Sequence, residues 1–375
     1  MLFPHPLRLL ALLPLLAAPV LSYDKTACNN SPSLCSAPYN SLLHLGAHNS
    51  AFVRTRENKY STAGNQYFNV STQLSGGIRL LQSQLHSDNG AVKLCHTSCQ
   101  LFDAGLLRNW LKEIKVWLDA NPSEVVTILL VNDDKISPNL LAAEYKAAGL
   151  DSMVMEPTDK TWQTKTLQEF IDSGKRVVSY LSTGADTNAV PWLMNEFDHI
   201  FETGFENTDA AAFSCVATRP GVVAGEDKLK EAVQTRMGLM NRFLYQEISK
   251  SLKIYVNNDT YAATVNGDKG VGNLKDGVET CFGQWGKRAG YVILDFVNEG
   301  NPAQVVDSFN NVTNPVNRQQ FPKNPKDDDK ERNQNYASGW DQVEKLAAMA
   351  RNGTKITTGQ WVFAAGDWKG VWDRL

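Results

Sequence analysis

The sequence predicts an α/β fold, and within that class a (β/α)8 barrel of the TIM type with a C-terminal extension. Apolar strand-like runs alternate with helical patterns over about 260 residues, the usual order for a parallel sheet and length for a barrel. The composition, 42% hydrophobic and 21% charged, is that of a soluble globular protein. The sequence contains none of the Gly-rich nucleotide-binding motifs that would favour a doubly wound open sheet.

The expected elements follow one another in this alternating order. Residues 41–48 and 76–86 predict strands, and the second alternates between two faces. Residues 106–122 predict a helix, because apolar residues recur at helical spacing before Asn121-Pro122. Residues 124–132 form a continuous apolar run, typical of a parallel strand buried on both faces. The later expected elements are helices at 137–149 and 166–174, strands at 175–182 and 291–298, helix-to-strand material at 192–205, and a helix at 339–351.

The first 22 residues predict a secretory signal peptide. They contain one basic residue, Arg8, and then an apolar run that is short and interrupted by proline. The C-terminal end lacks the hydrophobic tail of a lipid-anchor signal, so we expect a free, secreted, extracellular protein. The barrel should then span residues 23–310. Residues 311–375 should form a polar loop and an extension packed on the barrel.

The cysteines and sequons agree with secretion. Six cysteines suggest three disulfides in an oxidising compartment, and no pair has the CxxC spacing of the rival zinc site. Local spacing favours Cys28–Cys35 and Cys95–Cys99, which leaves Cys215–Cys281. The candidate glycosylation sites are Asn29, Asn69, Asn258, Asn311 and Asn352.

Polar side chains stand at or near the carboxyl ends of four expected strands. They are His48, His96, Asn132 and Asp295. In a TIM-type barrel this end carries the active site, whereas packing alone would call for apolar residues there. Histidine titrates near neutral pH, so two histidines at this end suit general acid and base catalysis.

The motifs around these residues resemble those of the PLC-like phosphodiesterases, the X-domain barrels of phosphatidylinositol-specific phospholipases C. The resemblance rests on LLHLGAHNSAF, GGIRLLQSQLH, VKLCHTSC, WLDANPSEVVTILLVN, TLQEFIDSGKRVVSY and YVILDFVN, in this order over about residues 40 to 310, and is strongest to the secreted fungal branch. It implies that His48 is the general base, His96 the general acid and Asp295 the carboxylate that orients the base. Asn49 matches a metal-binding asparagine of the calcium-dependent branch.

The second strand departs from the family pattern. Gln82 and Gln84 stand where the calcium-dependent branch has two acidic residues and the bacterial metal-free branch an aspartate and an arginine. Since Ca²⁺ prefers several carboxylate oxygens, we expect no cofactor, with Ca²⁺ as the alternative. Gln82 and Gln84 are predicted to bind substrate, with Asn49 and Asn132. Arg79, earlier in this strand, is expected to be structural.

These features predict a secreted phosphoric diester hydrolase that acts on phosphoinositide-like or related lipid or glycan phosphodiesters. The alternative is a weak or inactive barrel that binds phosphorylated polyols or glycans, because glutamines supply no charge for a phosphorane. The net charge of -3 argues against a nucleic-acid partner. We expect a monomer that makes transient contact with a membrane surface.

Overall fold

The computed structural model describes residues 23–157, 161–223, 226–249 and 254–324, and the short strands 356–358 and 361–363. The expected signal peptide, the helix at 339–351 and the sequon at Asn352 lie outside these residues. No helix among the described residues is long and apolar enough to cross a membrane.

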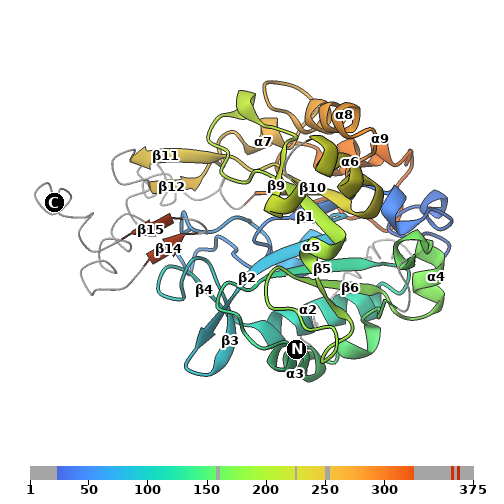
Figure 1. Cartoon of the computed structure of the whole chain (residues 1–375), viewed down its shortest axis with the longest axis horizontal. Helices are drawn as coiled ribbons and strands as arrows, with labels where there is room; N and C mark the ends of the chain where they lie inside the picture. Colours follow the sequence, from blue (N-terminus) through green and yellow to red (C-terminus); the bar gives the residue numbers. More distant parts are fainter. Residues whose placement is uncertain are drawn as a thin grey trace, which may run out of the picture.

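A curled, mainly parallel sheet forms the centre of the molecule (Figure 1). Across the sheet from β7 to β8, each strand runs parallel to its neighbours. In spatial order they are β7 (Leu193–Asn195), β6 (Val177–Leu181), β5 (Val126–Val131), β2 (Leu80–Asp88), β1 (His44–Ala47), β13 (Tyr291–Leu294), β10 (Met237–Asn241) and β8 (Ile200–Thr203). The expected α/β class is therefore confirmed.

The expected closed barrel is not observed, because within the described residues no hydrogen-bonded ladder joins β7 to β8. Only the one-turn helix α5 (Glu196–His199) separates these strands in the chain. A crossover between adjacent parallel strands needs about a dozen residues, so four residues cannot return the chain to the start of β7. Strand β9 (Ala217–Arg219) instead pairs antiparallel with the open edge of β8.

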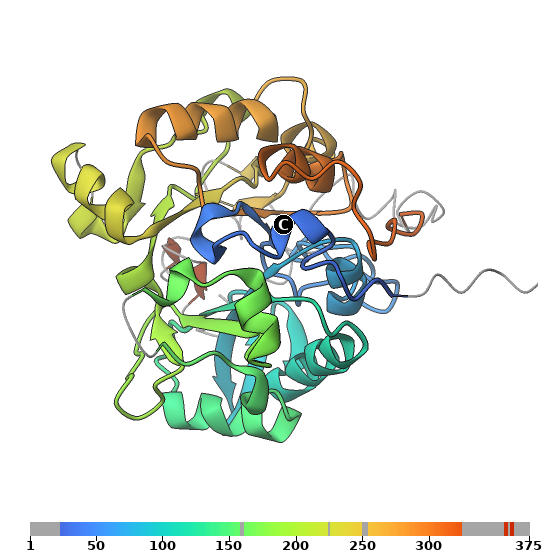
Figure 2. The same cartoon turned by 90° about the vertical axis from the view of Figure 1, so that its right-hand side faces the viewer.

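Helices cover the outside of the sheet, as Figure 2 shows. In α2, the helical spacing read from the sequence is confirmed: residues from Leu107 to Leu118 at that spacing are buried. The outer helices are α1 (Val70–Ser75), α2 (Leu107–Ala120), α3 (Pro138–Ala148), α4 (Leu167–Asp172), α6 (Glu226–Thr235), α7 (Ala262–Val265), α8 (Leu274–Trp285) and α9 (Pro302–Phe309). Single 3-10 turns lie at Pro32–Leu34, Tyr39–Ser41, Asp151–Met153, Trp162–Thr164, Ala210–Ala212 and Gly221–Val223.

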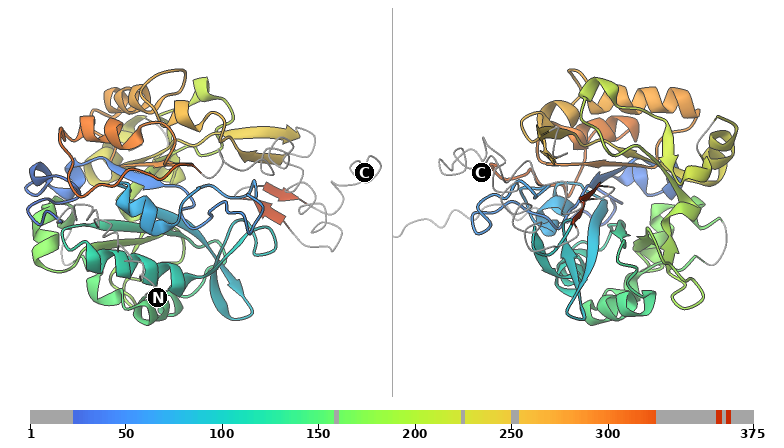
Figure 3. Two further views of the ribbon diagram at one scale, coloured as in Figure 1. Left: turned by 180° about the vertical axis from the view of Figure 1, so that it is seen from behind. Right: turned by 60° about the vertical axis from the view of Figure 1, so that its left-hand side comes forward.

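Hairpins extend the sheet at the carboxyl end of the parallel strands, which we call the mouth. Strand β2 continues into β3 (Ala91–Cys95) and β4 (Asp103–Leu106), and β11 (Tyr245–Ser249) pairs with β12 (Ile254–Asn257). Both hairpins project from the same side of the molecule, as the views from the front and from behind show (Figures 1 and 3). A further short hairpin joins β14 (Ile356–Thr358) to β15 (Trp361–Phe363).

Alternation along the strands decides which side chains reach the interior. Leu81 and Val292 pack in the cluster that contains the helix residues, whereas Leu80 and Ile293 belong to a second cluster inside the curled sheet. Since side chains two apart share a face, the interior positions continue toward the mouth with polar residues. These interior residues are His48, Gln82, Glu202, Asn241 and Asp295.

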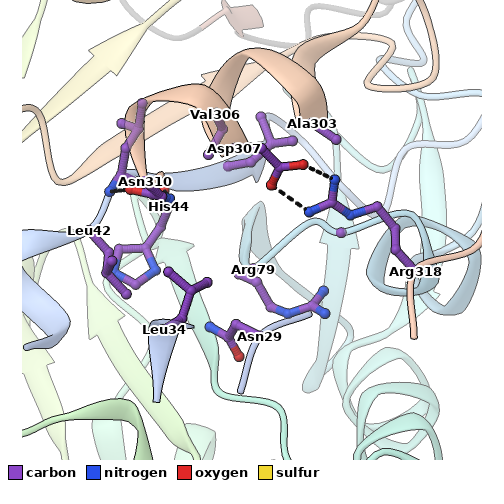
Figure 4. A pocket seen from close by; sticks show the side chains of 13 residues that line it. Asn29, Leu34, Leu42, His44, Arg79, Ala303, Val306, Asp307, Asn310 and Arg318 are labelled. Carbon is purple, nitrogen blue, oxygen red and sulfur yellow. Dashed lines mark hydrogen bonds and ion pairs between the residues drawn. The ribbon is translucent and has the colours of Figure 1, made fainter. Parts of the chain in front are cut away.

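The opposite end of the strands, which we call the base, contains a small pocket (Figure 4). It is lined by His44 and Arg79 from the strand starts and by Asp307 and Asn310 from the end of α9. Arg318 forms a two-fold ion pair with Asp307 there, so residues just after 310 pack across the base. This pocket lies at the other end of the strands from the polar residues of the mouth.

The disulfides have the predicted pairing, Cys28–Cys35, Cys95–Cys99 and Cys215–Cys281. Of the sequons, Asn69 and Asn311 are exposed and Asn258 is half-buried. Asn29 is a correction: it is only 8% exposed, and its Oδ1 accepts the amide of Val125, so the folded chain has no room for a glycan there.

Candidate active site

His48 and Asp295 meet because their strands are in register. Ala47 of β1 pairs with Leu294 of β13, and the next residue on each strand is His48 and Asp295. The His48 Nδ1 and Asp295 Oδ1 atoms are 2.7 Å apart, and both side chains are buried. The carboxylate accepts the Nδ1 proton, so the Nε2 atom of a neutral His48 carries the lone pair.

The rest of the His48 ring is held by stacking. The Phe243 ring lies parallel to it, with the ring centroids 3.7 Å apart and an angle of 3° between the planes. The Nε2 atom of His48 has no hydrogen-bond partner among the described residues. A buried, immobilised imidazole with one free basic nitrogen is the arrangement that a general base requires.

His96 reaches the same place from a different element. It follows β3, inside the short loop closed by the Cys95–Cys99 disulfide. Its Nδ1 atom donates to the carbonyl oxygen of Ala63, and its ring stacks on Phe52 at 5.1 Å. Burial lowers the pKa of His96 to about 4, so the resting side chain is neutral near neutral pH.

Asn49 lies between the two histidines. Its Nδ2 atom is 3.4 Å from the Nε2 atom of His96, and its backbone follows His48 directly. The Asn49 side-chain oxygen is buried and has no hydrogen-bond partner among the described residues, so this amide retains an unused acceptor beside His96. A buried acceptor without a partner is costly, and native interiors contain few such atoms.

The two glutamines of β2 brace the residues that follow the histidines. Gln82 Oε1 accepts the backbone amide of Asn49 at 2.6 Å, and Gln84 Oε1 accepts that of Thr97 at 3.0 Å. Each glutamine therefore fixes one histidine-bearing turn. Neither Nε2 amide makes a hydrogen bond within the described part of the chain, which leaves both as donors.

The backbone is strained immediately after each of the three predicted catalytic residues. Asn49, Thr97 and Phe296 have φ angles of 49°, 65° and 49°. Asparagine tolerates the left-handed region, but a β-branched threonine and a bulky phenylalanine are outliers there. Such strain persists only where surrounding contacts enforce it, and it concentrates at functional sites.

Asn132 is not part of this cluster. Its side chain bonds to backbone groups of Ile136 and Thr183, and its own backbone amide donates to Ser182. These contacts tie the loop after β5 to the loop after β6 and occupy both ends of the amide. The structure therefore gives Asn132 a bracing role instead of the substrate contact that its strand-end position suggested.

Several residues near the histidines were not identified from the sequence. Asn65 and Gln66, from the loop between β1 and α1, contact Asp295 and the backbone of His48. No motif surrounds them, so only the fold reveals this role. At the open seam of the mouth, Glu202 pairs with Arg219 and shares a hydrogen bond with Glu196. Inward alternation along residues 200–203 could have placed Glu202 inside the sheet.

The residues at this site do not fit Ca²⁺. Both glutamine oxygens on β2 already accept backbone amides, and Asp295 is the carboxylate that holds His48. Ca²⁺ takes six to eight oxygen ligands, several of them carboxylates. Within the described residues, no group of three or more His, Cys, Asp or Glu side chains is arranged to hold a metal.

Comparison with known proteins finds related sequences in a fungus and in human. Two proteins of the fungus Arthroderma benhamiae, an uncharacterized secreted protein and a PI-PLC X domain-containing protein 1, are 35% and 34% identical to it. Each alignment covers 76% of this chain, and they cover 64% of the first relative and 89% of the second. A human PI-PLC X domain-containing protein 1 is 27% identical over 41% of the chain and 47% of that relative.

Solved structures of two bacterial phosphatidylinositol-specific phospholipases C are also similar. The Staphylococcus aureus protein has a TM-score of 0.48 at 16% identity, over 76% of this chain and 98% of that chain. The Listeria monocytogenes protein has a TM-score of 0.45 at 14% identity, over 74% and 95%. The PI-PLC X 1 family matches residues 34–310, which include every residue of the histidine cluster. The chain therefore belongs to the PI-PLC X domain family.

Proposed function

We propose that this protein is an extracellular phosphodiesterase in which His48 and His96 act as an acid–base pair. One observation carries the proposal. The Nδ1 atom of each histidine is occupied, by Asp295 in one case and by the Ala63 carbonyl in the other. Both Nε2 atoms are thereby the working nitrogens, and that of His96 lies 3.4 Å from the side-chain amide of Asn49, the residue after His48.

The chemistry follows from these two nitrogens. A hydroxyl group of the substrate, next to its phosphodiester, gives its proton to Nε2 of His48 as its oxygen attacks phosphorus. The bond from phosphorus to the departing alcohol breaks, and that oxygen takes a proton from Nε2 of His96. Such proton transfers contribute about 10²–10⁴-fold each to a rate. The products are a cyclic phosphate and a free alcohol.

His96 must be protonated when it acts as the acid. A phosphodiester carries a negative charge, and an opposite charge within about 4–6 Å favours the protonated imidazole. A half-turn of the Asn49 amide would then present its unpaired oxygen to the new Nε2 proton. The substrate itself thus supports the protonated state that burial disfavours in the resting protein.

Amide N–H donors would stabilise the negative charge on the phosphorane. The free Nε2 groups of Gln82 and Gln84 support a substrate-binding role. We expect metal independence because β2 offers amides and no carboxylates at these two positions. Arg219 is a cation at the open seam, but Glu202 already compensates it. Preorganised neutral donors stabilise such charge less than a cation would, so we expect modest turnover.

The substrate class we propose is a lipid or glycan phosphodiester with a neighbouring hydroxyl, of the phosphoinositide type. Phosphorus NMR of the purified protein with phosphatidylinositol micelles tests this, in EDTA and in Ca²⁺. A cyclic phosphate that appears first, at equal rates in both, is the expected result. A linear phosphate without a cyclic precursor, or activity restored only by Ca²⁺, would overturn the mechanism.

A second function, binding without turnover, is favoured by the neutral resting state of His96 and by the uncharged amides of Gln82 and Gln84 on β2. It predicts that inositol phosphate binds in calorimetry while no phosphodiester is consumed. The two functions are separated by measuring binding and product formation on the same preparation.

A further inference from the structure

The loop between β1 and α1 touches His48, His96 and Asp295. This loop, residues 50–66, supplies the Ala63 carbonyl that accepts from His96 and the Phe52 ring on which His96 stacks. It also supplies Asn65, whose Nδ2 atom donates to Asp295 Oδ1 at 2.9 Å. One short segment therefore sets the position of both histidines.

Asn65 and His48 converge on a single oxygen. The His48 Nδ1 atom lies 2.7 Å from Asp295 Oδ1, Asn65 Nδ2 lies 2.9 Å from it, and the two nitrogens are 3.3 Å apart. Two donors fix the direction of the carboxylate. The second donor also draws charge away from the shared oxygen, which keeps the proton on the imidazole.

The loop is itself clamped, so Asn65 has little freedom. Arg54 is 1% exposed and donates to the Gly64 carbonyl at 2.7 Å, and Asn257 of β12 donates to the same carbonyl at 3.1 Å. The Asn65 backbone accepts the amide of Phe296, the strained residue after Asp295. Gln66 completes the link by donating to the carbonyls of His48 and Leu294.

We propose that Asn65 is a positioning residue that sets the orientation and basicity of the Asp295–His48 pair. Asn65 is 0% exposed, so it cannot touch a bound phosphodiester and acts only through Asp295. The proposal rests on the proposed function for its kinetic consequence, but not for its effect on His48. The other titratable groups beside this pair are His96 and Tyr245, which the test leaves unchanged.

Asn257 provides a matched control. Both asparagines are buried, both donate from Nδ2 to a fixed acceptor, and both have a buried Oδ1 without a partner in the part of the chain that the structure describes. They differ in the acceptor, which is the Asp295 carboxylate for Asn65 and a loop carbonyl for Asn257. Any effect of losing a buried amide near this loop should therefore appear in both.

The experiment compares Asn65→Asp and Asn65→Ala with Asn257→Asp and Asn257→Ala. Titration of the His48 ring, followed by NMR of the full chain without substrate, should shift upward in N65A, because Asp295 loses its second donor and keeps more negative charge beside the imidazolium. N257A should leave that titration in place. N65D is nearly isosteric, and a buried carboxyl group beside Asp295 stays protonated and can still donate to it, so N65D should keep the titration of the parent.

The kinetic arm uses phosphatidylinositol micelles. N65A should lower kcat by about 10- to 100-fold with KM unchanged, since a misdirected base costs rate without weakening binding. N257A should keep the kcat of the parent. An unshifted His48 titration in N65A, or a shifted one in N65D, overturns the proposal, whether or not the protein turns over substrate. Absence of turnover in every variant, with the shift intact, contradicts the proposed function alone.

Discussion

One histidine lies at each end of β1, His44 at its start and His48 just after its last residue. The two differ in their hydrogen-bond partners. His44 at the base and His48 at the mouth are 4% and 6% exposed and project into the same interior. His44 bonds to the carbonyl of Tyr39 at 2.9 Å and packs on the ring of Tyr39. His48 bonds to a carboxylate and keeps its other nitrogen free. Burial alone therefore does not distinguish a structural histidine from a reactive one, whereas the partner does.

The same difference extends to the groups around each histidine. At the base, Arg79 donates to Glu124, to Asn30 and to carbonyls, and Tyr39 shares its hydroxyl with Thr127 and Tyr291. At the mouth, Asn49, Asn65 and Asp295 each retain a buried oxygen without a hydrogen-bond partner among the described residues. Native interiors rarely leave such atoms unpaired. At the base the corresponding atom is a donor, Arg318 Nε, so the unused acceptors gather at the mouth, where we place the chemistry.

The strongest test of this difference is to replace each of the two histidines with alanine, one at a time. His48→Ala should lower kcat/KM on phosphatidylinositol by about 10²–10⁴-fold, because the base is lost. Its melting temperature should change little compared with that of His44→Ala, which loses a ring bonded to the Tyr39 carbonyl and packed on Tyr39 and Tyr291. Steady-state kinetics and thermal unfolding of both variants measure this. Equal activity in H48A and H44A would remove the distinction between the two ends.

The next test concerns the charge at the base. Arg79 and Glu124 are 5% and 1% exposed and form a two-fold ion pair, with nitrogen–oxygen distances of 2.6 and 3.0 Å. Glu124→Gln should destabilise the fold by about 3–5 kcal/mol, since it leaves a buried guanidinium without its counter-charge. The urea midpoint measures the loss. Activity per folded molecule should be unchanged, and a selective loss of kcat would mean that the base is coupled to the site.

Much of this comparison could be predicted from the sequence. The apolar run at 124–132 and the helical spacing from Leu107 to Leu118 became β5 and α2, because periodicity records which faces are buried. The inward direction of Gln82 and Gln84 followed from strand alternation. The contacts of Asn65 and Gln66 could not be predicted, since they depend on a loop meeting two strand ends that lie more than 200 residues apart in the chain.

The seam between β7 and β8 shows a second limit of prediction from the sequence. Residues 192–205 were expected as helix and strand, but the strand, the single turn and the next strand follow without a Gly or Pro to separate them. Local signals indicate where elements begin and end, not whether a sheet closes. Closure depends on the length of the connection and on what fills the edge, which here is β9.

Acid should weaken both ends, through the buried His44 at the base and the half-buried His96 at the mouth. Burial lowers the pKa of His44 to about 4, and that of His96 likewise, whereas unfolded histidine titrates near 6.5. The unfolded chain therefore binds protons first as pH falls. The stability that neutral burial contributes is complete above about 6.5 and is lost toward pH 4, by roughly 3 kcal/mol for His44. His44→Gln should flatten the stability profile over this window in urea titrations. An identical slope in the variant would contradict the assignment.

The last test concerns the seam, where polar groups stand in place of a ladder between β7 and β8. Glu196 and Glu202 are 1% and 2% exposed and share a hydrogen bond, and Arg219 pairs with Glu202. Burial, and then the charge of Glu202, raises the pKa of Glu196 well above its usual value. Glu196 thus stays protonated in the fold while the unfolded chain ionises it above about pH 4.5, so its contribution to stability is lost as pH rises. Glu196→Gln cannot ionise in either state. Its stability relative to the parent should therefore increase steadily from pH 5 to pH 8 in chemical unfolding, with kcat unaltered, and a constant difference across this range would show that Glu196 is already ionised.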